Sequence, residues 1–232
     1  MSAALGLGAR NLGRTWPNPS VGCVIVQNGR VVGRGFTQPG GRPHAETQAL
    51  AQAGDQARGA TAYVTLEPCA HHGKTPPCAE ALVAAGIKRC VIATGDPDPR
   101  VAGGGIATLK RAGIEITEGV LEPQAREANA GFFTRIKLGR PLITLKLATS
   151  LDGRIATVTG ESKWITGPEA RAAGHQLRAT HDAIMVGSGT VRADDPELTC
   201  RLPGLEDRSP IRIVLDTQLS LPVTRKIFSD QD

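Results

Sequence analysis

The chain has 232 residues, of which 40% are hydrophobic, so it is long enough to bury the cores of two small globular domains. The net charge is +5, but the Lys and Arg residues are scattered and only 3% of the residues are aromatic. These features do not favour a nucleic-acid surface, which would need a basic run or a stacking platform. They leave room for attraction of small anions such as phosphates.

Membrane insertion and secretion are not expected. No run of eighteen apolar residues occurs, and the first ten residues are too weakly apolar for a signal peptide, so they predict an amphipathic helix. The five cysteines are an odd number and suit a reducing cytoplasm better than a disulfide framework.

The first half of the chain predicts a mixed sheet covered by helices on both faces. Residues 21–27 and 30–36 alternate as two strands around the tight turn Asn28-Gly29. The elements that follow alternate between helices (44–56, 77–86 and 103–113) and strands (60–66, 89–94 and 114–117).

A polar, helical stretch at 122–140 leads to a boundary at Gly139-Arg140-Pro141. We therefore expect a first domain at 1–121, a helical linker at 122–140 and a second domain at 141–232. In the second domain the pattern predicts strands at 141–147, 183–187 and 211–215 and a helix at 168–180. Strands separated by helices indicate a second α/β sheet.

His44-Ala45-Glu46, Pro68-Cys69 and Cys78 carry the clearest chemical signal. The signature of zinc deaminases is His-x-Glu followed by Pro-Cys-x-x-Cys, in which one imidazole and two thiolates hold the metal. Here eight residues separate Cys69 from Cys78, with one Gly and two Pro forming a turning loop. The ligand set predicts a zinc ion with an open position for water, and Glu46 as the group that moves protons between the water and the leaving amine.

A structural zinc site is the alternative reading of the same residues. Such sites are usually closed by four ligands, and the fourth would have to be His71 or His72. A second glycine-rich piece, from Gly187 to Thr190, follows the strand 183–187. It could let a phosphate approach the backbone, but it lacks the dinucleotide fingerprint, and a plain tight turn is the simpler interpretation.

Six segments together resemble one family. They are PNPSVGCVIV at 17–26, HAE at 44–46, TLEPCAHHGKTPPC at 65–78, LKLATSLDGRIA at 145–156, GESKWIT at 160–166 and GTVRADDPELTCR at 189–201. The chain resembles the bacterial bifunctional deaminase/reductase family of riboflavin biosynthesis over essentially its whole length, including the eight-residue spacing between the two cysteines.

The resemblance implies an α/β fold, with a cytidine-deaminase-like three-layer domain followed by part of a dihydrofolate-reductase-like domain. It implies zinc-dependent deamination of 2,5-diamino-6-(5-phosphoribosylamino)pyrimidin-4(3H)-one, then NADPH-dependent reduction of the ribose to a ribityl chain. The family continues past residue 232, so we expect only the first part of the reductase here. The expected setting is a cytoplasmic homo-oligomer that binds a phosphorylated pyrimidine and no nucleic acid or membrane.

The resemblance also assigns residues. Zinc ligation falls on His44, Cys69 and Cys78, and proton transfer on Glu46. Substrate contacts in the deaminase are expected at Asn18, His71 and Lys74. Contacts with NADPH are expected at Ala148, Trp164, Thr190 and Asp194. Contacts with the reductase substrate are expected at Lys146, Ser162, Arg178, Leu198 and Arg201, with Lys146 and Asp194 nearest the chemistry.

Two rival functions remain open at this point. A tRNA or nucleoside deaminase would explain His-x-Glu and the basic charge, but not the long loop between the cysteines or the second α/β section. A non-catalytic, zinc-stabilised module would not need a carboxylate at position 46.

Overall fold

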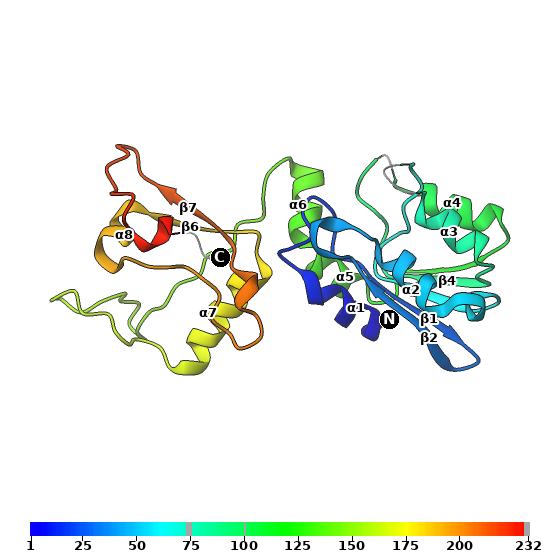
Figure 1. Ribbon diagram of the computed structural model, residues 1–232, viewed down its shortest axis with the longest axis horizontal. Coiled ribbons are helices and arrows are strands. Elements are labelled where there is room, and N and C mark those ends of the chain that lie inside the picture. Colours follow the sequence, from blue (N-terminus) through cyan, green and yellow to red (C-terminus); the bar gives the residue numbers. More distant parts are fainter. Residues whose placement is uncertain (73–75, 100, 230–232) are drawn as a thin grey trace. The chain divides into compact units, whose positions relative to one another are not determined.

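The computed structural model describes residues 1–72, 76–99 and 101–229. The chain divides into two compact units, Met1–Leu142 and Ile143–Asp232, which are described separately below (Figure 1). Across the described residues, no helix has the length and apolar character needed to cross a membrane.

The first unit is built on a mixed sheet with the strand order β2-β1-β3-β4-β5. Strands β1 (Gly22–Gln27) and β2 (Arg30–Phe36) form the predicted hairpin, and β1 also pairs antiparallel with β3 (Thr61–Val64). Parallel pairing then joins β3 to β4 (Arg89–Ile92) and β4 to β5 (Glu115–Glu118). The predicted mixed sheet is confirmed.

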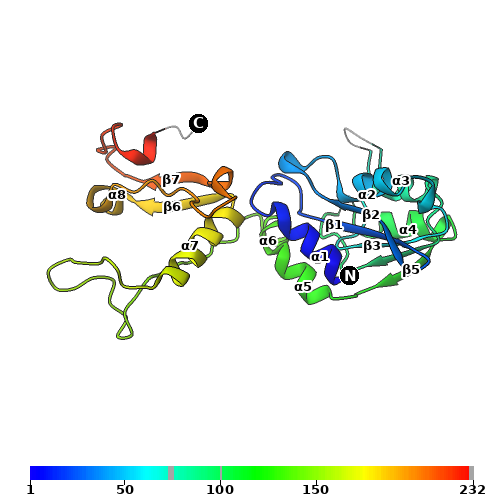
Figure 2. The same ribbon diagram turned by 60° about the horizontal axis from the view of Figure 1, so that its bottom comes forward.

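Helices cover both faces of this sheet (Figure 2). On one face lie α2 (Ala45–Ala53), α3 (Cys78–Ala84) and α4 (Gly104–Arg111). On the other lie α1 (Ser2–Gly8) and α5 (Glu122–Ala128), followed in the chain by α6 (Ala130–Leu138). The main core lies between the sheet and the first group of helices and is built from small and aliphatic side chains such as Ile25, Val64 and Leu82.

Helix α2 lies unusually close to strand β2 because the strand carries glycine at the contact. A Cβ atom on Gly33 would come within 2.2 Å of the Ala49 carbonyl oxygen, and one on Gly35 within 2.0 Å of the Ala45 carbonyl oxygen. Side chains at these two positions would push the helix away from the sheet. Since α2 begins directly after His44, the two glycines also set the position of that imidazole.

Residues 122–140 form helices, as predicted, but the structure places them in the first unit. Ala125 is fully buried and Phe133 joins the main core. Between the two helices, the Asn129 side chain accepts a hydrogen bond from the Ser20 amide (2.8 Å) and donates one to the Ser20 carbonyl (3.0 Å). These two hydrogen bonds attach the segment to the residues just before β1.

The second unit contains a pair of parallel strands, β6 (Ala183–Gly187) and β7 (Ile211–Leu215). Helix α7 (Pro168–Thr180) and the short helix α8 (Ser188–Asp194) accompany them, and Val191 and Ile227 lie in a small core. The glycine-rich piece after β6, interpreted from the sequence as a turn, is the start of α8. Alternate side chains of β7 are exposed to solvent, and Ile211 is 71% exposed.

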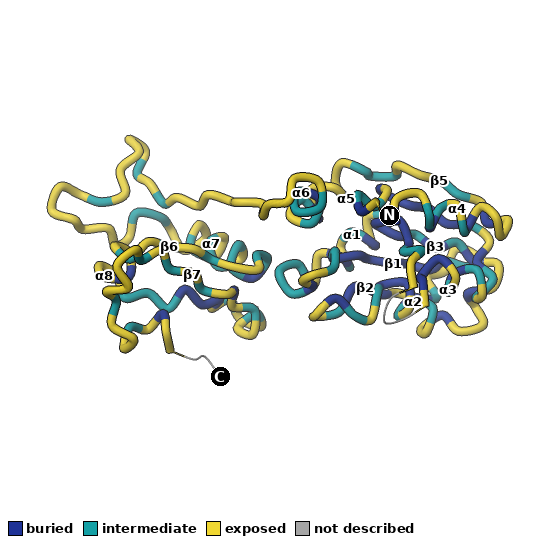
Figure 3. Tube along the Cα trace, turned by 90° about the horizontal axis from the view of Figure 1, so that it is seen from above, coloured by how far each residue is buried: buried dark blue, intermediate teal, exposed yellow. Residues whose placement is uncertain are grey.

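The strand predicted at 141–147 is wrong. This segment joins no ladder among the described residues, and Ile143 and Leu145 are 76% and 79% exposed (Figure 3). Alternating or continuous apolar residues indicate that a segment can form a strand, but the strand exists only where a neighbouring edge accepts its hydrogen bonds. Among the described residues, neither β6 nor β7 pairs with this segment.

Candidate metal centre and a second cavity

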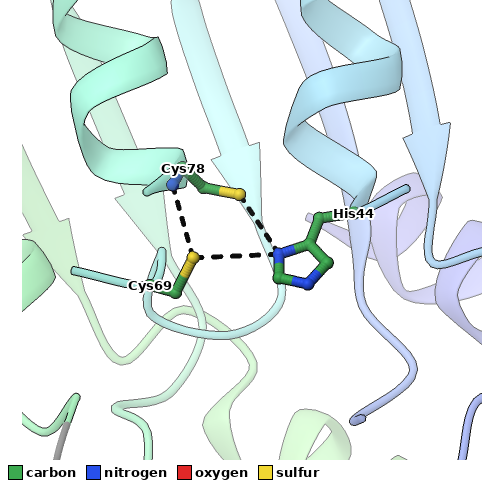
Figure 4. A group of neighbouring side chains, drawn as sticks. All are labelled: His44, Cys69 and Cys78. Carbon is green, nitrogen blue, oxygen red and sulfur yellow. Dashed lines mark hydrogen bonds between the residues drawn. The ribbon is translucent and has the colours of Figure 1, made fainter. Parts of the chain in front are cut away.

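Three side chains from different segments converge at the ends of the elements of the first unit. His44 immediately precedes α2, Cys69 follows β3, and Cys78 is the first residue of α3. Their possible ligand atoms all lie within 4.8 Å of one another (Figure 4). His44 Nδ1 is 3.3 Å from Cys78 Sγ and 3.8 Å from Cys69 Sγ.

Backbone bonds hold the two cysteines together across the long loop between them. The Cys78 amide donates to Cys69 Sγ (3.3 Å), and the Ala79 amide donates to the Cys69 carbonyl (3.1 Å). Pro77 adopts an extended conformation directly before α3, which suits its place ahead of a helix. The eight-residue insertion therefore returns Cys78 to Cys69 at the start of a rigid helix.

The two thiols differ in protonation. Hydrogen bonding from Cys78 and His44 lowers the pKa of Cys69 to about 4, although burial opposes this. The pKa of Cys78 is raised because its proton is held in a hydrogen bond to Cys69 and because the group is buried. The hydrogen bond with Cys69 also raises the pKa of His44. Cys69 is therefore the thiol that loses its proton more readily, and metal binding by both cysteines requires the Cys78 proton to leave as well.

One nitrogen and two sulfur donors suit zinc. Among the described residues, no fourth His, Cys, Asp or Glu joins the group. The two candidates for a fourth ligand lie elsewhere: His72 pairs with Glu80 (3.2 Å) on the surface, and His71 lines the adjacent pocket. The arrangement fits a metal with an open position better than a closed structural site.

Glu46 lies in the first turn of α2 and is only 4% exposed. Burial, and secondly the negative charge on Cys69, raises the pKa of its carboxyl group to about 7. A carboxyl group that titrates near neutrality can both take up and release a proton at physiological pH. Cys78 also hydrogen-bonds to this carboxyl group, which places it beside the ligand cluster.

A cavity of 190 Å³ opens beside this centre and is lined by His44, Glu46 and Cys69. Asn18 and His71, two of the predicted substrate contacts, also line it. The Asn18 side chain donates to the Gly41 carbonyl (2.8 Å) and its Nδ2 lies 3.5 Å from His44 Nε2. Lys74, the third predicted contact, lies outside the described residues.

Sequence reasoning missed several residues of this pocket. Glu67, Asp96, Asp98, Arg42, Phe132 and Arg135 also line it. Position in the sequence could have indicated Arg42 and Glu67, which stand beside His44 and before Pro68-Cys69. Nothing in the sequence indicated Phe132 and Arg135, because they come from α6, far along the chain.

The second unit contains a larger cavity, of 780 Å³. Eight of the nine residues predicted around NADPH and the reductase substrate line it: Lys146, Ala148, Ser162, Trp164, Arg178, Asp194, Leu198 and Arg201. The ninth, Thr190, is exposed in the first turn of α8 and is not part of the lining.

Two arginines of this cavity are held in place by neighbouring groups. Arg178 donates to the Thr199 carbonyl (2.8 Å), and Arg201 donates to Glu197 (3.1 Å) and to the Thr199 hydroxyl (3.0 Å). Burial, and secondly the charge of Arg201, lowers the pKa of Arg178. Two cations in one cavity can receive an anionic ligand, and the indole of Trp164, stacked under Arg171 at 4.4 Å, adds a flat apolar surface.

Comparisons with known proteins match both units. Residues 1–94 match the family model for the cytidine and deoxycytidylate deaminase zinc-binding region, and residues 141–232 match the RibD C-terminal domain. Two relatives are named riboflavin biosynthesis protein RibD. The one from Aquifex aeolicus is 50% identical over all of this chain and 65% of its own length, and the one from Escherichia coli is 51% identical over 94% of this chain and 62% of its own length.

Solved structures agree with these matches. Acinetobacter baumannii RibD has a TM-score of 0.89 at 50% identity, covering 97% of this chain and 65% of that one. The diaminohydroxyphosphoribosylaminopyrimidine deaminase/5-amino-6-(5-phosphoribosylamino)uracil reductase of Thermotoga maritima has a TM-score of 0.92 at 43% identity, covering 99% and 66%. The chain thus spans just under two thirds of the length of these relatives. With a cytidine-deaminase-like unit followed by a unit that matches the RibD C-terminal domain, it belongs to the RibD family of riboflavin biosynthesis proteins.

Proposed function

We propose that the first unit is a zinc-dependent aminohydrolase. Its substrate is 2,5-diamino-6-(5-phosphoribosylamino)pyrimidin-4(3H)-one, and its place is riboflavin biosynthesis. The observation that carries the proposal is the cluster of His44, Cys69 and Cys78, with buried Glu46 beside it and a small cavity at its side. The matches to RibD proteins, which extend over nearly the whole of this chain, favour this substrate over tRNA or a nucleoside.

The chemistry follows from the residues present. Zinc held by His44, Cys69 and Cys78 would supply the Lewis acidity that activates water near neutral pH. Glu46 takes a proton from the attacking water and delivers it to the departing amine, so that water adds to the ring carbon and ammonia leaves. The cavity wall, including Asn18, orients the heterocycle and excludes bulk water.

Glu46→Gln tests this role because the amide retains the shape of the side chain and cannot carry the proton. We expect zinc content to stay at one ion per chain while ammonia release falls by roughly 10²–10⁴-fold. Glu127→Gln, a substitution of the same kind at an exposed position of α5, is the control and should behave as wild type. Unchanged turnover in Glu46→Gln, or loss of zinc along with activity, would refute the assignment.

We further propose that the second unit contributes to an NADPH-dependent reductase that acts on the deaminated product. The support is the 780 Å³ cavity, which is lined by Arg178, Arg201, Trp164 and Lys146 among others. In this reaction the cofactor supplies the hydride, and the protein binds and orients it. Quenching of Trp164 fluorescence by NADPH, absent in Trp164→Phe, would support binding, and equal signals from both proteins would count against it.

The oligomeric state and the location of the protein are part of the same proposal. We expect a homo-oligomer in the cytoplasm. Light scattering of the purified chain measures the oligomeric state, and a monomer mass at micromolar concentration would exclude a homo-oligomer.

A further inference from the structure

We propose that Arg135 on α6 binds the phosphate group of the deaminase substrate at the rim of the zinc pocket, with Arg42 as a second cation. This inference rests on the proposed function and names the subsite for the anionic arm. It adds two residues to the substrate contacts predicted from the sequence.

The guanidinium of Arg135 is already held in one place. It stacks on the Trp16 ring at 4.9 Å and on the Phe132 ring at 5.6 Å. One of its nitrogens, Nη2, donates to the Pro17 carbonyl (2.9 Å). These contacts already restrict the rotamers of Arg135, so binding a phosphate costs less conformational entropy than it would for a free arginine. A guanidinium has five N–H donors, so the bond to Pro17 leaves a fork with which to meet a phosphate.

The position of Arg135 relative to the metal ligands is set by two consecutive residues. Pro17 accepts the hydrogen bond from Arg135, and the next residue, Asn18, lies against His44. Arg42 approaches from the other direction, since it lies two residues before His44 and lines the same cavity. Both cations therefore line the cavity that His44 also lines.

The size of the cavity places the phosphate at the rim. At 190 Å³ the cavity is smaller than the roughly 300–1,000 Å³ typical of sites that enclose a whole ligand. A pyrimidine ring can enter it, while the phosphoribosyl arm must extend outward. Trp16 is 62% exposed, so the stacked Arg135 lies where buried and exposed surface meet.

The acidic residues of the pocket belong to a different segment. The Glu67 carboxylate receives the amides of Asp96 and Gly103, which gathers Asp96 and Asp98 on the loop after β4. An anionic arm is repelled by that loop and attracted to Arg135 and Arg42. With the phosphate at the arginines, the loop that carries Asp96 and Asp98 is left to accept hydrogen bonds from the amino groups of the pyrimidine ring.

The test compares Arg135→Gln with Lys137→Gln. Lys137 is the matched control because it lies on the same helix, over the Phe133 ring at 5.8 Å, and does not line the cavity. Each zinc-loaded protein is assayed with the phosphorylated substrate and with its enzymatically dephosphorylated form. For Arg135→Gln we expect KM for the phosphorylated substrate to rise about tenfold or more with kcat within about threefold, because a charge-assisted contact to a non-reacting group contributes binding alone.

With the dephosphorylated substrate, Arg135→Gln and wild type should have the same KM, and Lys137→Gln should match wild type with both substrates. An Arg135→Gln effect of equal size on both substrates, or no effect on either, would overturn the proposal while leaving the deaminase function intact.

A binding measurement separates this subsite from the proposed reaction. Ribose 5-phosphate is titrated into the zinc-loaded proteins by calorimetry, without turnover. We expect at least about tenfold weaker binding to Arg135→Gln than to wild type or Lys137→Gln. If wild type deaminates neither substrate but this difference is present, the proposed reaction fails and the phosphate subsite stands. Equal binding of ribose 5-phosphate by all three proteins would reject the subsite.

Discussion

Glu67 offers the sharpest test of how the fold supports the metal centre. Its side chain is 4% exposed, and its carboxylate accepts hydrogen bonds from three backbone amides: Asp96 (3.3 Å), Gly103 (3.0 Å) and Ile106 (3.1 Å). Two of these amides lie at the start of α4, so the carboxylate caps that helix from outside and complements its dipole. Glu67 also stands two residues before Cys69, which ties the capped helix to the ligand.

The expected cost can be worked out from these bonds. A buried donor left without a partner costs roughly 1–3 kcal/mol, so Glu67→Ala, which frees three, should cost about 3 kcal/mol or more. Glu67→Gln keeps one carbonyl oxygen but turns an amide nitrogen toward a donor and removes the charge, so we expect about 2–3 kcal/mol. With an m-value of roughly 1–3 kcal/mol/M in urea, the glutamine variant should unfold at about 1 M less urea.

The assay follows amide NMR signals of the first unit through a urea titration, which separates its unfolding from that of the second unit. Hydrogen exchange at Gly103 and Ile106 should accelerate in both variants. The control is Glu118→Gln, which removes an exposed ion pair with Lys110 and should cost at most about 1 kcal/mol. A Glu67→Gln midpoint equal to that of Glu118→Gln, with unchanged exchange at both amides, would contradict the reasoning.

Three further predictions concern pH, packing and metal binding. Burial raises the pKa of Asp96 from 3.8 to about 6, so the folded chain binds more protons than the unfolded chain in that window and stability falls as pH rises through it. In Asp96→Asn this decrease in stability with rising pH should be absent. If the urea midpoints of variant and wild type change in parallel between pH 4 and 7, the assignment to Asp96 is wrong. Gly33→Ala should destabilise the first unit by about 1–3 kcal/mol, because its Cβ meets a backbone carbonyl oxygen. Gly6→Ala, which has open space on α1, should stabilise the unit by about 0.5–1 kcal/mol. Melting temperatures that shift in the same direction for both variants would disprove the packing argument. Zinc binding at pH 7 should release at least one proton, that of Cys78, because Cys69 is already a thiolate; calorimetric heats that do not depend on the ionisation enthalpy of the buffer would exclude this.

The local elements of the first unit were predictable because each follows from neighbouring residues. The hairpin around Asn28-Gly29 matches its two-residue turn, and the strand at 60–66 and the helix at 77–86 appear as β3 and α3 with slightly shorter bounds. The zinc cluster was predictable for a different reason. Its ligand types and their attachment to element ends are chemical requirements that the sequence displays directly.

Pairing and long-range contact were not predictable in this way. Residues 141–147 have the composition of a strand, yet whether they form one depends on an edge supplied by another segment. Residues 122–140 carry a helical pattern that cannot reveal whether the helices pack, and the bonds between Asn129 and Ser20 decided that they do.

The sequence by itself indicated the candidate donor atoms of the metal centre, the carboxylate proposed to carry the proton and the order of helices and strands in the first unit, because these depend on residue type and short-range spacing. Only the tertiary structure decided what surrounds them. It brought α6 against the segment before β1, so that Arg135 and Phe132 line a pocket whose metal ligands lie some sixty to ninety residues earlier in the chain. Such contacts arise from how whole elements pack, and the spacing of residues along the chain carries no record of them.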